Sequence, residues 1–289
     1  MKNVVFASAL GLIVSFGLIA VLEYNKTPQL TQRNLAPVYI PPNRPRIIAP
    51  RPLPTKPVTP TPEFKNYAPL RSVSNLGKVL SDIESHMPAG HIYKDSDKIT
   101  WGHETSHGIH SRLRMKFGEG KKINGFYVLN NRAAIIEEPR TTIQAAARLV
   151  PKSLRGGVYQ LYMIRQASSW GDTPLYIFDE WVAYTNGAAV RLDLNIQNRQ
   201  ETVEYMLEFN VYAISVAKAA NTTDPQFKNF LMWHLDRTMK LYESNKSLGD
   251  LSDSTAYWEK VKTSSGAESF RQYTRQYLGA EWTKEILGF

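Results

Sequence analysis

The sequence predicts a mostly α-helical domain with a small β-sheet or hairpin, an α+β fold, over residues 70–289. Apolar residues recur through most of this region at the three- and four-residue spacing of one helix face. The exception is the segment 126–136, where two apolar runs flank Asn130 and Asn131. Asparagine tolerates the left-handed backbone of a tight turn, so this segment is expected to be a β-hairpin. We expect it beside a cleft, where an edge strand can pair with an extended peptide.

Residues 1–26 are expected to form a transmembrane anchor or a signal peptide. Residues 4–22 are an unbroken apolar run of 19 residues, close to the length of a bilayer-spanning helix. The run ends in Val21 and Leu22, without the small residue expected just before a cleavage point, which favours an uncleaved anchor. Cleavage near residues 15–17 is the alternative. An anchor would leave the remaining chain on the exported side of the membrane, periplasmic or extracellular, and cleavage would make it secreted.

Residues 27–69 are expected to be an extended linker, because twelve of the chain's 17 prolines fall in them. Proline favours polyproline II over helix or sheet, and at about 3.1 Å per residue the segment could span on the order of 100 Å. We expect a passive spacer, and a proline-rich docking ligand is the alternative. The linker also carries basic side chains that could contact an anionic membrane or cell-wall polymer, namely Arg44, Arg46, Arg51, Lys56 and Lys65.

The net charge of +9 does not indicate a nucleic-acid-binding surface. Residues 1–69 contribute +6, and the remaining 220 residues contribute only +3, without a basic cluster. Nucleic acid is therefore not expected as a partner. The chain has no cysteine, which excludes disulfides, thiolate metal ligands and cysteine nucleophiles.

Helices are expected along the whole of the predicted domain. Those that bear on function are 102–116, which ends near Gly118, and 175–186, which is followed by Gly187 as a cap. The others are expected at 72–86, 141–150, 157–168, 200–220, 225–244, 254–262, 267–277 and 281–287.

The helix 102–116 carries the run His103-Glu104-Thr105-Ser106-His107. Histidines at i and i+4 lie on one helix face about 6 Å apart, so both imidazoles can reach one zinc ion. The glutamate beside the first histidine can then accept a proton from a water at the open position of the metal. His110 lies about 10 Å along the helix axis from the first histidine, too far to bind the same ion, and is expected to line the cleft.

A zinc site needs a third protein ligand, and the helix 175–186 offers Asp179 and Glu180. A carboxylate within so apolar and aromatic a segment needs a partner when it is buried, and a cation would supply one. Adjacent helix positions point about 100° apart, so only one of the two carboxylates can face the metal. The spacing alone does not decide between them.

Together, the His-Glu-x-x-His pattern and the later Glu180-x-x-Ala183 resemble the gluzincin branch of the zincin metallopeptidases. The resemblance is limited to these two segments. It implies a zincin-like domain in which His103, His107 and Glu180 bind Zn²⁺. It also implies that Glu104 is the general base of a hydrolytic reaction.

The chain departs from related patterns at two points. Leu113 stands where the metzincin branch has its third histidine, which excludes that branch. Tyr184 stands where gluzincins usually have an acidic residue that orients a zinc-binding histidine, so we expect Asp179 to take over that role. Tyr184 is then expected in the cleft, where its hydroxyl could bond a zinc-binding histidine or stabilise the oxyanion formed during hydrolysis.

The expected function is that of an exported, membrane-tethered zinc metallopeptidase that hydrolyses peptide bonds in a protein or peptide substrate. The alternative is a catalytically inactive zincin-like module that serves binding or assembly in a cell envelope or virion. Tyr159, Tyr162 and His234 could also stabilise the oxyanion, but each is expected to be a structural side chain in the core or at its edge.

Overall fold

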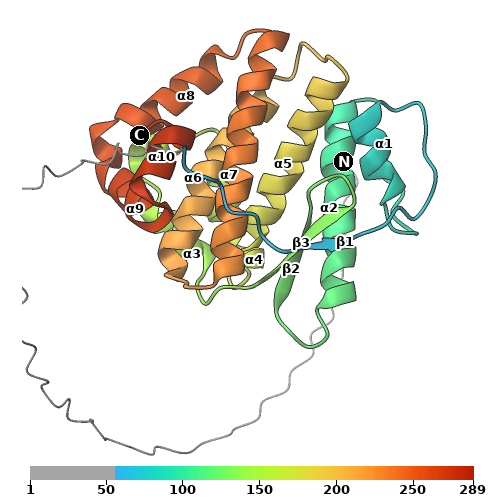
Figure 1. Ribbon diagram of the computed structural model, residues 1–289, viewed down its shortest axis with the longest axis horizontal. Helices are drawn as coiled ribbons and strands as arrows, with labels where there is room; N and C mark the ends of the chain where they lie inside the picture. Colours follow the sequence, from blue (N-terminus) through green and yellow to red (C-terminus); the bar gives the residue numbers. More distant parts are fainter. Residues whose placement is uncertain (1–55) are drawn as a thin grey trace, which may run out of the picture. The chain divides into compact units, whose positions relative to one another are not determined.

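The computed structural model describes residues 56–289 as a mostly helical domain with one three-stranded antiparallel sheet (Figure 1). This confirms the predicted α+β class. No helix within residues 56–289 is long and apolar enough to cross a membrane. The predicted membrane segment and most of the predicted linker lie outside the described residues.

Helices make up most of the described chain, and the strands all precede α3. In chain order the strands and α-helices are β1 (Phe64–Asn66), α1 (Lys78–Ser85), α2 (Lys98–Phe117), β2 (Ile123–Tyr127), β3 (Arg132–Glu137), α3 (Ile143–Leu149), α4 (Ala167–Trp170), α5 (Tyr176–Asp193), α6 (Glu201–Ala220), α7 (Pro225–Asn245), α8 (Ser252–Thr263), α9 (Glu268–Leu278) and α10 (Ala280–Leu287). A π-helical segment, Gln160–Arg165, precedes α4.

The predicted hairpin is present, because β2 and β3 pair antiparallel. Its turn holds residues 129–131 in the left-handed region, with φ angles of 71°, 56° and 61°. β1 pairs with the other edge of β3, which gives the order β1-β3-β2. This strand lies within the segment predicted as linker, and Tyr67 just after it is only 3% exposed. The domain boundary predicted at Leu70 is therefore too late, because apolar residues among the prolines add a strand to the sheet.

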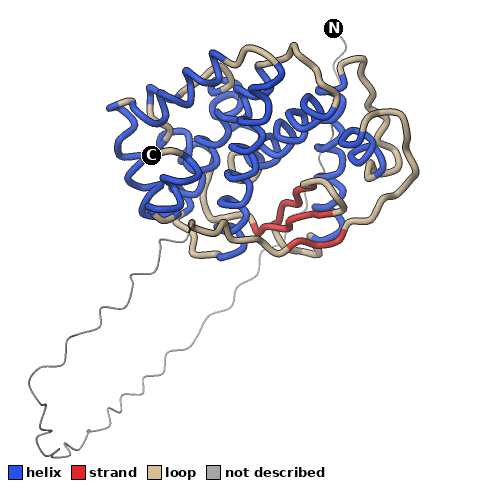
Figure 2. Tube along the Cα trace, turned by 45° about the horizontal axis from the view of Figure 1, so that its top comes forward, coloured by secondary structure: helices blue, strands red, loops and turns tan. Residues whose placement is uncertain are grey.

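The edge strand β2 is not available to an extended peptide. All five of its residues are buried, and it packs against α2 and α5. A Cβ at Gly125 would lie 2.4 Å from Leu113 Cβ, so strand and helix α2 are in close contact. Figure 2 shows the three strands grouped together at one side of the helices. The predicted peptide-pairing role of the hairpin is therefore wrong, because helices cover the strand.

Helix α5 packs against α2 on one side and α6 on the other (Figure 1). Most of it is buried, including Trp181 at 0% exposure. The helix continues to Asp193, so the predicted cap at Gly187 is wrong. Glycine suits this position for a different reason, because a Cβ there would lie only 3.3 Å from Ile99 Cγ2 on α2. The residue thus permits the close approach of the two helices.

The other predicted helices are present with shifted ends. α1 begins at Lys78 rather than at residue 72, because Gly77 before it has a φ of 77°. α2 begins at Lys98, ahead of the predicted start, because Asp97 Oδ1 accepts a hydrogen bond from the Ile99 N–H at 3.0 Å and caps the helix. The predicted helix 157–168 is divided between the π-helical segment and α4.

The start of α5 is held by Glu138, whose Oε2 accepts a hydrogen bond from the Leu175 N–H at 3.0 Å. Burial raises the pKa of Glu138 to about 7. The folded protein therefore binds this proton more tightly than the unfolded chain does. The resulting contribution to the free energy of unfolding is lost as the pH rises through the folded-state pKa. Relative to Glu138→Gln, the wild-type free energy of unfolding should fall by on the order of 1–3 kcal/mol between about pH 5 and 8. Urea unfolding of both proteins across this range measures the effect, and a difference that stays constant with pH would contradict it.

Candidate metal centre

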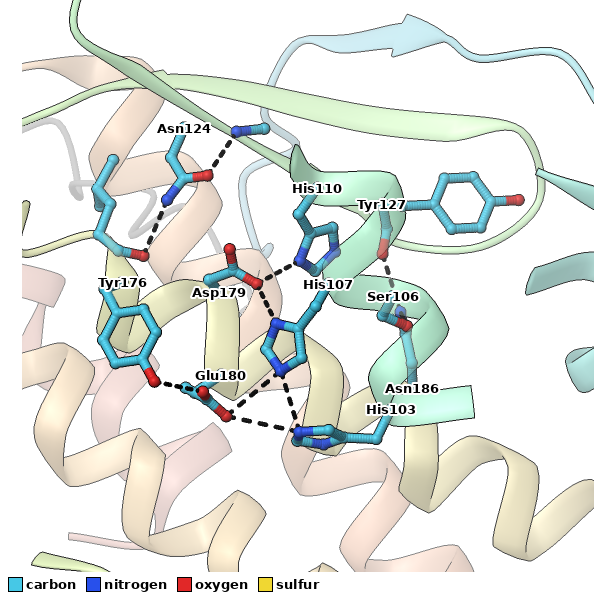
Figure 3. Close-up of polar contacts among 12 residues, drawn as sticks. His103, Ser106, His107, His110, Asn124, Tyr127, Tyr176, Asp179, Glu180 and Asn186 are labelled. Atoms are coloured by element: carbon cyan, nitrogen blue, oxygen red, sulfur yellow. Dashed lines mark hydrogen bonds and ion pairs between the residues drawn. The ribbon is translucent and has the colours of Figure 1, made fainter. Parts of the chain in front are cut away.

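Helix α2 presents His103 and His107 one turn apart on the side that faces α5 (Figure 3). The opposite side of α2 is buried in the core through residues such as Trp101, Ile109 and Leu113. A Cβ at Gly102 would lie 2.9 Å from Val190 Cγ2 of α5, so this glycine keeps the two helices close. Both histidines are thereby held within reach of the α5 carboxylates.

Three ligand atoms converge between the two helices. His103 Nε2 lies 3.0 Å from His107 Nε2, and each nitrogen lies 3.5 Å from Glu180 Oε2. Tetrahedral zinc with ligands at about 2.0–2.1 Å requires them to be about 3.3 Å apart, close to this triangle. Glu180 Oε2 is buried and has no hydrogen-bond partner within the described residues. The residues present therefore fit a tetrahedral zinc ion that would satisfy this oxygen.

The other oxygen of the Glu180 carboxylate is fixed by Tyr176, whose hydroxyl donates to Glu180 Oε1 at 2.7 Å. The Tyr176 ring is itself stacked on Trp170, with the ring centroids 5.1 Å apart. This arrangement orients the carboxylate and leaves Oε2 for the histidines. Sequence reasoning missed Tyr176, although its position four residues before Glu180 on one helix is the signal that would have found it.

Asp179 supports the histidines from the side. His107 Nδ1 donates to Asp179 Oδ1 at 2.6 Å, and His110 Nδ1 donates to the same oxygen at 2.7 Å. Arg114 Nη1 donates to Asp179 Oδ2 at 2.6 Å. A carboxylate at Nδ1 fixes the ring orientation and tautomer of His107, so that Nε2 faces the triangle. Arg114 is another residue that sequence reasoning missed, and its signal is the i+4 spacing from His110.

His110 is fully buried at 0% exposure, so the prediction that it lines a cleft is wrong. It faces the core against Phe126, with ring centroids 5.9 Å apart, because the hairpin covers this part of α2. His107, His110 and Asp179 form a second group whose atoms are close enough to hold a metal. Both Nδ1 atoms of that group, however, lie within 2.7 Å of one carboxylate oxygen, which is hydrogen-bonding distance and shorter than the separation of about 3.3 Å between zinc ligands.

The electrostatics of the triangle favour a positive charge. Burial alone would lower the pKa of His107, but the carboxylates of Glu180 and Asp179 outweigh it and hold this pKa well above the usual range. Burial alone would raise the pKa of Glu180, and the neighbouring histidines instead hold it below the usual range. Two buried carboxylates beside two imidazoles therefore create a place that stabilises a cation.

Tyr184 borders the triangle on the side of His103, and Glu104 follows His103 on α2. The Tyr184 ring stands edge-on to the His103 ring, with centroids 4.4 Å apart, and its hydroxyl shares a hydrogen bond of 2.9 Å with Tyr162. Burial is the main influence on the pKa of Tyr184, which it raises, and the Glu104 carboxylate adds to this rise. The structure thus places Tyr184 against a proposed zinc ligand, His103. It commits the Tyr184 hydroxyl to another tyrosine rather than to a histidine.

His91 is a further residue at this site that the sequence analysis did not select. It comes from the loop between α1 and α2 and lies over Gly108, where a Cβ would be 2.7 Å from His91 Nδ1. Its Nε2 is buried without a hydrogen-bond partner in residues 56–289. The glycine immediately after the second histidine of the motif is the signal that room is left for another ring.

His234 and Tyr159 lie in the core, as predicted. His234 is fully buried, and its Nε2 lies 3.0 Å from Thr185 Oγ1. The Tyr159 hydroxyl donates to the Ala147 carbonyl at 3.0 Å. Neither side chain belongs to the triangle.

Comparisons of the chain with protein-family models, with curated proteins and with solved structures find no match. The resemblance to gluzincins therefore rests on the motif residues and on the geometry they adopt.

The hydroxyl of Tyr176 should matter for metal binding although it contacts no metal-facing atom. In Tyr176→Phe, Glu180 Oε1 loses its donor and the carboxylate is free to rotate. Loss of such an orienting bond typically lowers metal affinity by about 10–100-fold. Competition with a zinc chelator measures this change, and Tyr159→Phe, which removes a hydroxyl that bonds the Ala147 carbonyl rather than a ligand side chain, is the matched control. Equal zinc affinity in wild type and Tyr176→Phe would show that the bond does not orient the ligand.

Proposed function

We propose that this chain is a zinc-dependent metallopeptidase of gluzincin type with a zincin-like domain. His103, His107 and Glu180 would hold the Zn²⁺. The single observation that carries the proposal is the triangle of their three ligand atoms, with separations of 3.0 to 3.5 Å, at one corner of which a buried oxygen has no hydrogen-bond partner within residues 56–289. A chance pair of surface histidines would not face a buried carboxylate in this way.

Zinc at this position would supply a Lewis acid that polarises a carbonyl and lowers the pKa of a water molecule. Glu104, the neighbour of His103, would accept a proton from the attacking water and pass it to the departing amine. Glu104 is half-buried. His91, which lies over Gly108, and Tyr184, which lies edge-on to His103, would provide polar groups beside the triangle for orienting a peptide carbonyl.

Asp179, Arg114 and Tyr176 would act as positioning residues. Each holds a ligand side chain through a hydrogen bond or a short chain of them, and none belongs to the triangle. Such groups restrict the ligands to one orientation before metal binds, which reduces the entropy lost on binding.

The arrangement favours a catalytic over a closed structural site. A structural zinc site in proteins has four protein ligands, whereas this group of side chains offers three. His110 cannot supply the fourth, because its Nδ1 bonds Asp179 and its ring packs on Phe126. This supports the peptidase over the alternative of an inactive binding or assembly module. We further propose that the N-terminal segment tethers the enzyme to a membrane and that the domain acts on exported protein or peptide substrates.

Hydrolysis of an unstructured protein such as casein tests the proposal. The purified protein should cleave it, lose more than about 95% of the activity after treatment with a zinc chelator, and regain it when zinc is added back. Peptide release and zinc content are measured on the same samples. A protein that binds zinc at one equivalent and cleaves no casein or unfolded peptide would favour the binding module instead.

A further inference from the structure

A pocket lies between the turn of the β2–β3 hairpin and helix α7, and it has a volume of about 390 Å³. None of the proposed zinc ligands lines it. Its wall includes the side chains of Arg132 on β3 and of Trp233, Asp236, Arg237 and Lys240 on α7. This cluster of basic residues around one aromatic ring has no role in the proposed peptidase chemistry.

Two arginines of this wall have buried donors without acceptors. Arg237 Nη1 and Arg132 Nε are both buried, and within residues 56–289 neither has a hydrogen-bond partner. A guanidinium keeps its N–H donors at every physiological pH, so it cannot avoid the cost by losing a proton. Both side chains line the pocket, so after a small shift of either guanidinium an acceptor from outside the chain would reach these donors and remove the cost of leaving them unpaired.

The charge of the pocket points to the same kind of acceptor. Three cationic side chains line it, and its one carboxylate, Asp236, is engaged with Lys240 at 2.8 Å. Burial lowers the pKa of Arg237 to about 9, and the positive charge of Arg132 adds to this effect. The Arg132 charge thus disfavours the charge of Arg237, the Asp82 carboxylate offsets part of this effect, and an anion beside the two guanidiniums would offset more of it.

The two arginines are held in place by contacts that leave these donors unused. Arg237 Nη2 donates to Asn186 Oδ1 at 2.9 Å. The amide of Asn186 is fixed in turn by its own bonds to Ser106 Oγ and the Tyr127 carbonyl, both of 3.0 Å (Figure 3). The guanidinium carbons of Arg132 and Arg237 lie 5.5 and 5.9 Å from the Trp233 ring centroid. Aromatic contacts use the faces of a guanidinium, so the N–H groups in its plane remain available.

We propose that this pocket binds the oxyanion group of a small molecule, a phosphate or a carboxylate, between Arg132 and Arg237. Two N–H donors of one guanidinium have the spacing of two oxygens in a phosphate or a carboxylate. The Trp233 ring offers an apolar wall for the rest of the ligand.

Calorimetric titration of the full chain with inorganic phosphate and, separately, with acetate tests the proposal at constant ionic strength set with chloride. At least one anion should bind saturably at one site. Arg132→Gln should weaken that binding at least tenfold, because it removes one of the two guanidiniums. Within residues 56–289 this guanidinium contacts the Phe64 and Trp233 rings and makes no hydrogen bond or ion pair that the substitution would break. Arg148→Gln, which removes an exposed arginine from α3, should bind as wild type does. Tighter binding of phosphate would identify a phosphate ester as the ligand class, and tighter binding of acetate a carboxylate.

The proposal fails if neither anion binds saturably or if Arg132→Gln binds as tightly as wild type. Arg237→Gln is a second variant, and its circular dichroism and melting temperature show whether it is folded. A folded Arg237→Gln protein with wild-type affinity would also overturn the proposal. Because each comparison is between variants, binding of phosphate to a metal elsewhere in the protein cannot produce the expected difference.

Discussion

Replacement of Glu104 by glutamine should abolish peptide hydrolysis while the fold and the zinc content stay unchanged. Glu104 is the acidic side chain next to His103 on α2 and is not part of the ligand triangle. An amide of the same size cannot accept a proton, so the loss falls on the chemical step rather than on metal binding. Removal of a general base typically costs about 10²–10⁴ in rate, and we expect kcat/KM to fall by about 10³-fold.

The measurement is the initial rate of casein cleavage by wild type and Glu104→Gln at equal zinc occupancy. Glu119→Gln, an exposed position just beyond the end of α2, is the matched control and should keep the full rate. A Glu104→Gln enzyme that cleaves at the wild-type rate would show that a different group takes the proton.

Removal of the Glu180 carboxylate should have the largest effect on metal binding. Glu180→Ala deletes one corner of the triangle and should lower zinc affinity by about 10³-fold or more, because a three-ligand site becomes a two-ligand site. Asp179→Asn should lower zinc affinity by only about 10–100-fold, since Asp179 bonds the Nδ1 atoms of His107 and His110 and none of the three ligand atoms. Asparagine keeps the size of the side chain and one acceptor for the neighbouring donors.

Competition of each variant with a chelator of known zinc affinity separates the two carboxylates. Melting temperatures of the metal-free proteins show whether any loss reflects unfolding, because Asp179 is buried among charged partners. Tight zinc binding by Glu180→Ala together with its loss in Asp179→Asn would mean that Asp179 is the ligand.

Local patterns in the sequence were sufficient for part of this site. The spacing of His103 and His107 predicts a shared helix face, and the structure places both on one side of α2. The turn at Asn130 and Asn131 predicts the hairpin, because asparagine adopts the left-handed backbone found there. Both features depend on residues a few positions apart, where backbone geometry alone decides the outcome.

Features that depend on packing between distant segments could not be read in this way. Which of the two carboxylates, Asp179 or Glu180, reaches the Nε2 atoms of the histidines depends on the rotation of α5 against α2. Close contacts at Gly102 and Gly187 set this rotation. The burial of His110 depends on the hairpin that covers α2, and sequence spacing contains no information about that contact. The strand β1 was missed because the prolines around it obscure its pairing with β3.

The most direct test of the zinc assignment is anomalous diffraction at the zinc edge from crystals of the protein prepared with one equivalent of zinc. We expect one strong peak per chain within about 2.2 Å of His103 Nε2, His107 Nε2 and Glu180 Oε2. A peak among His107, His110 and Asp179 instead, or no peak between α2 and α5, would contradict the proposed metal centre.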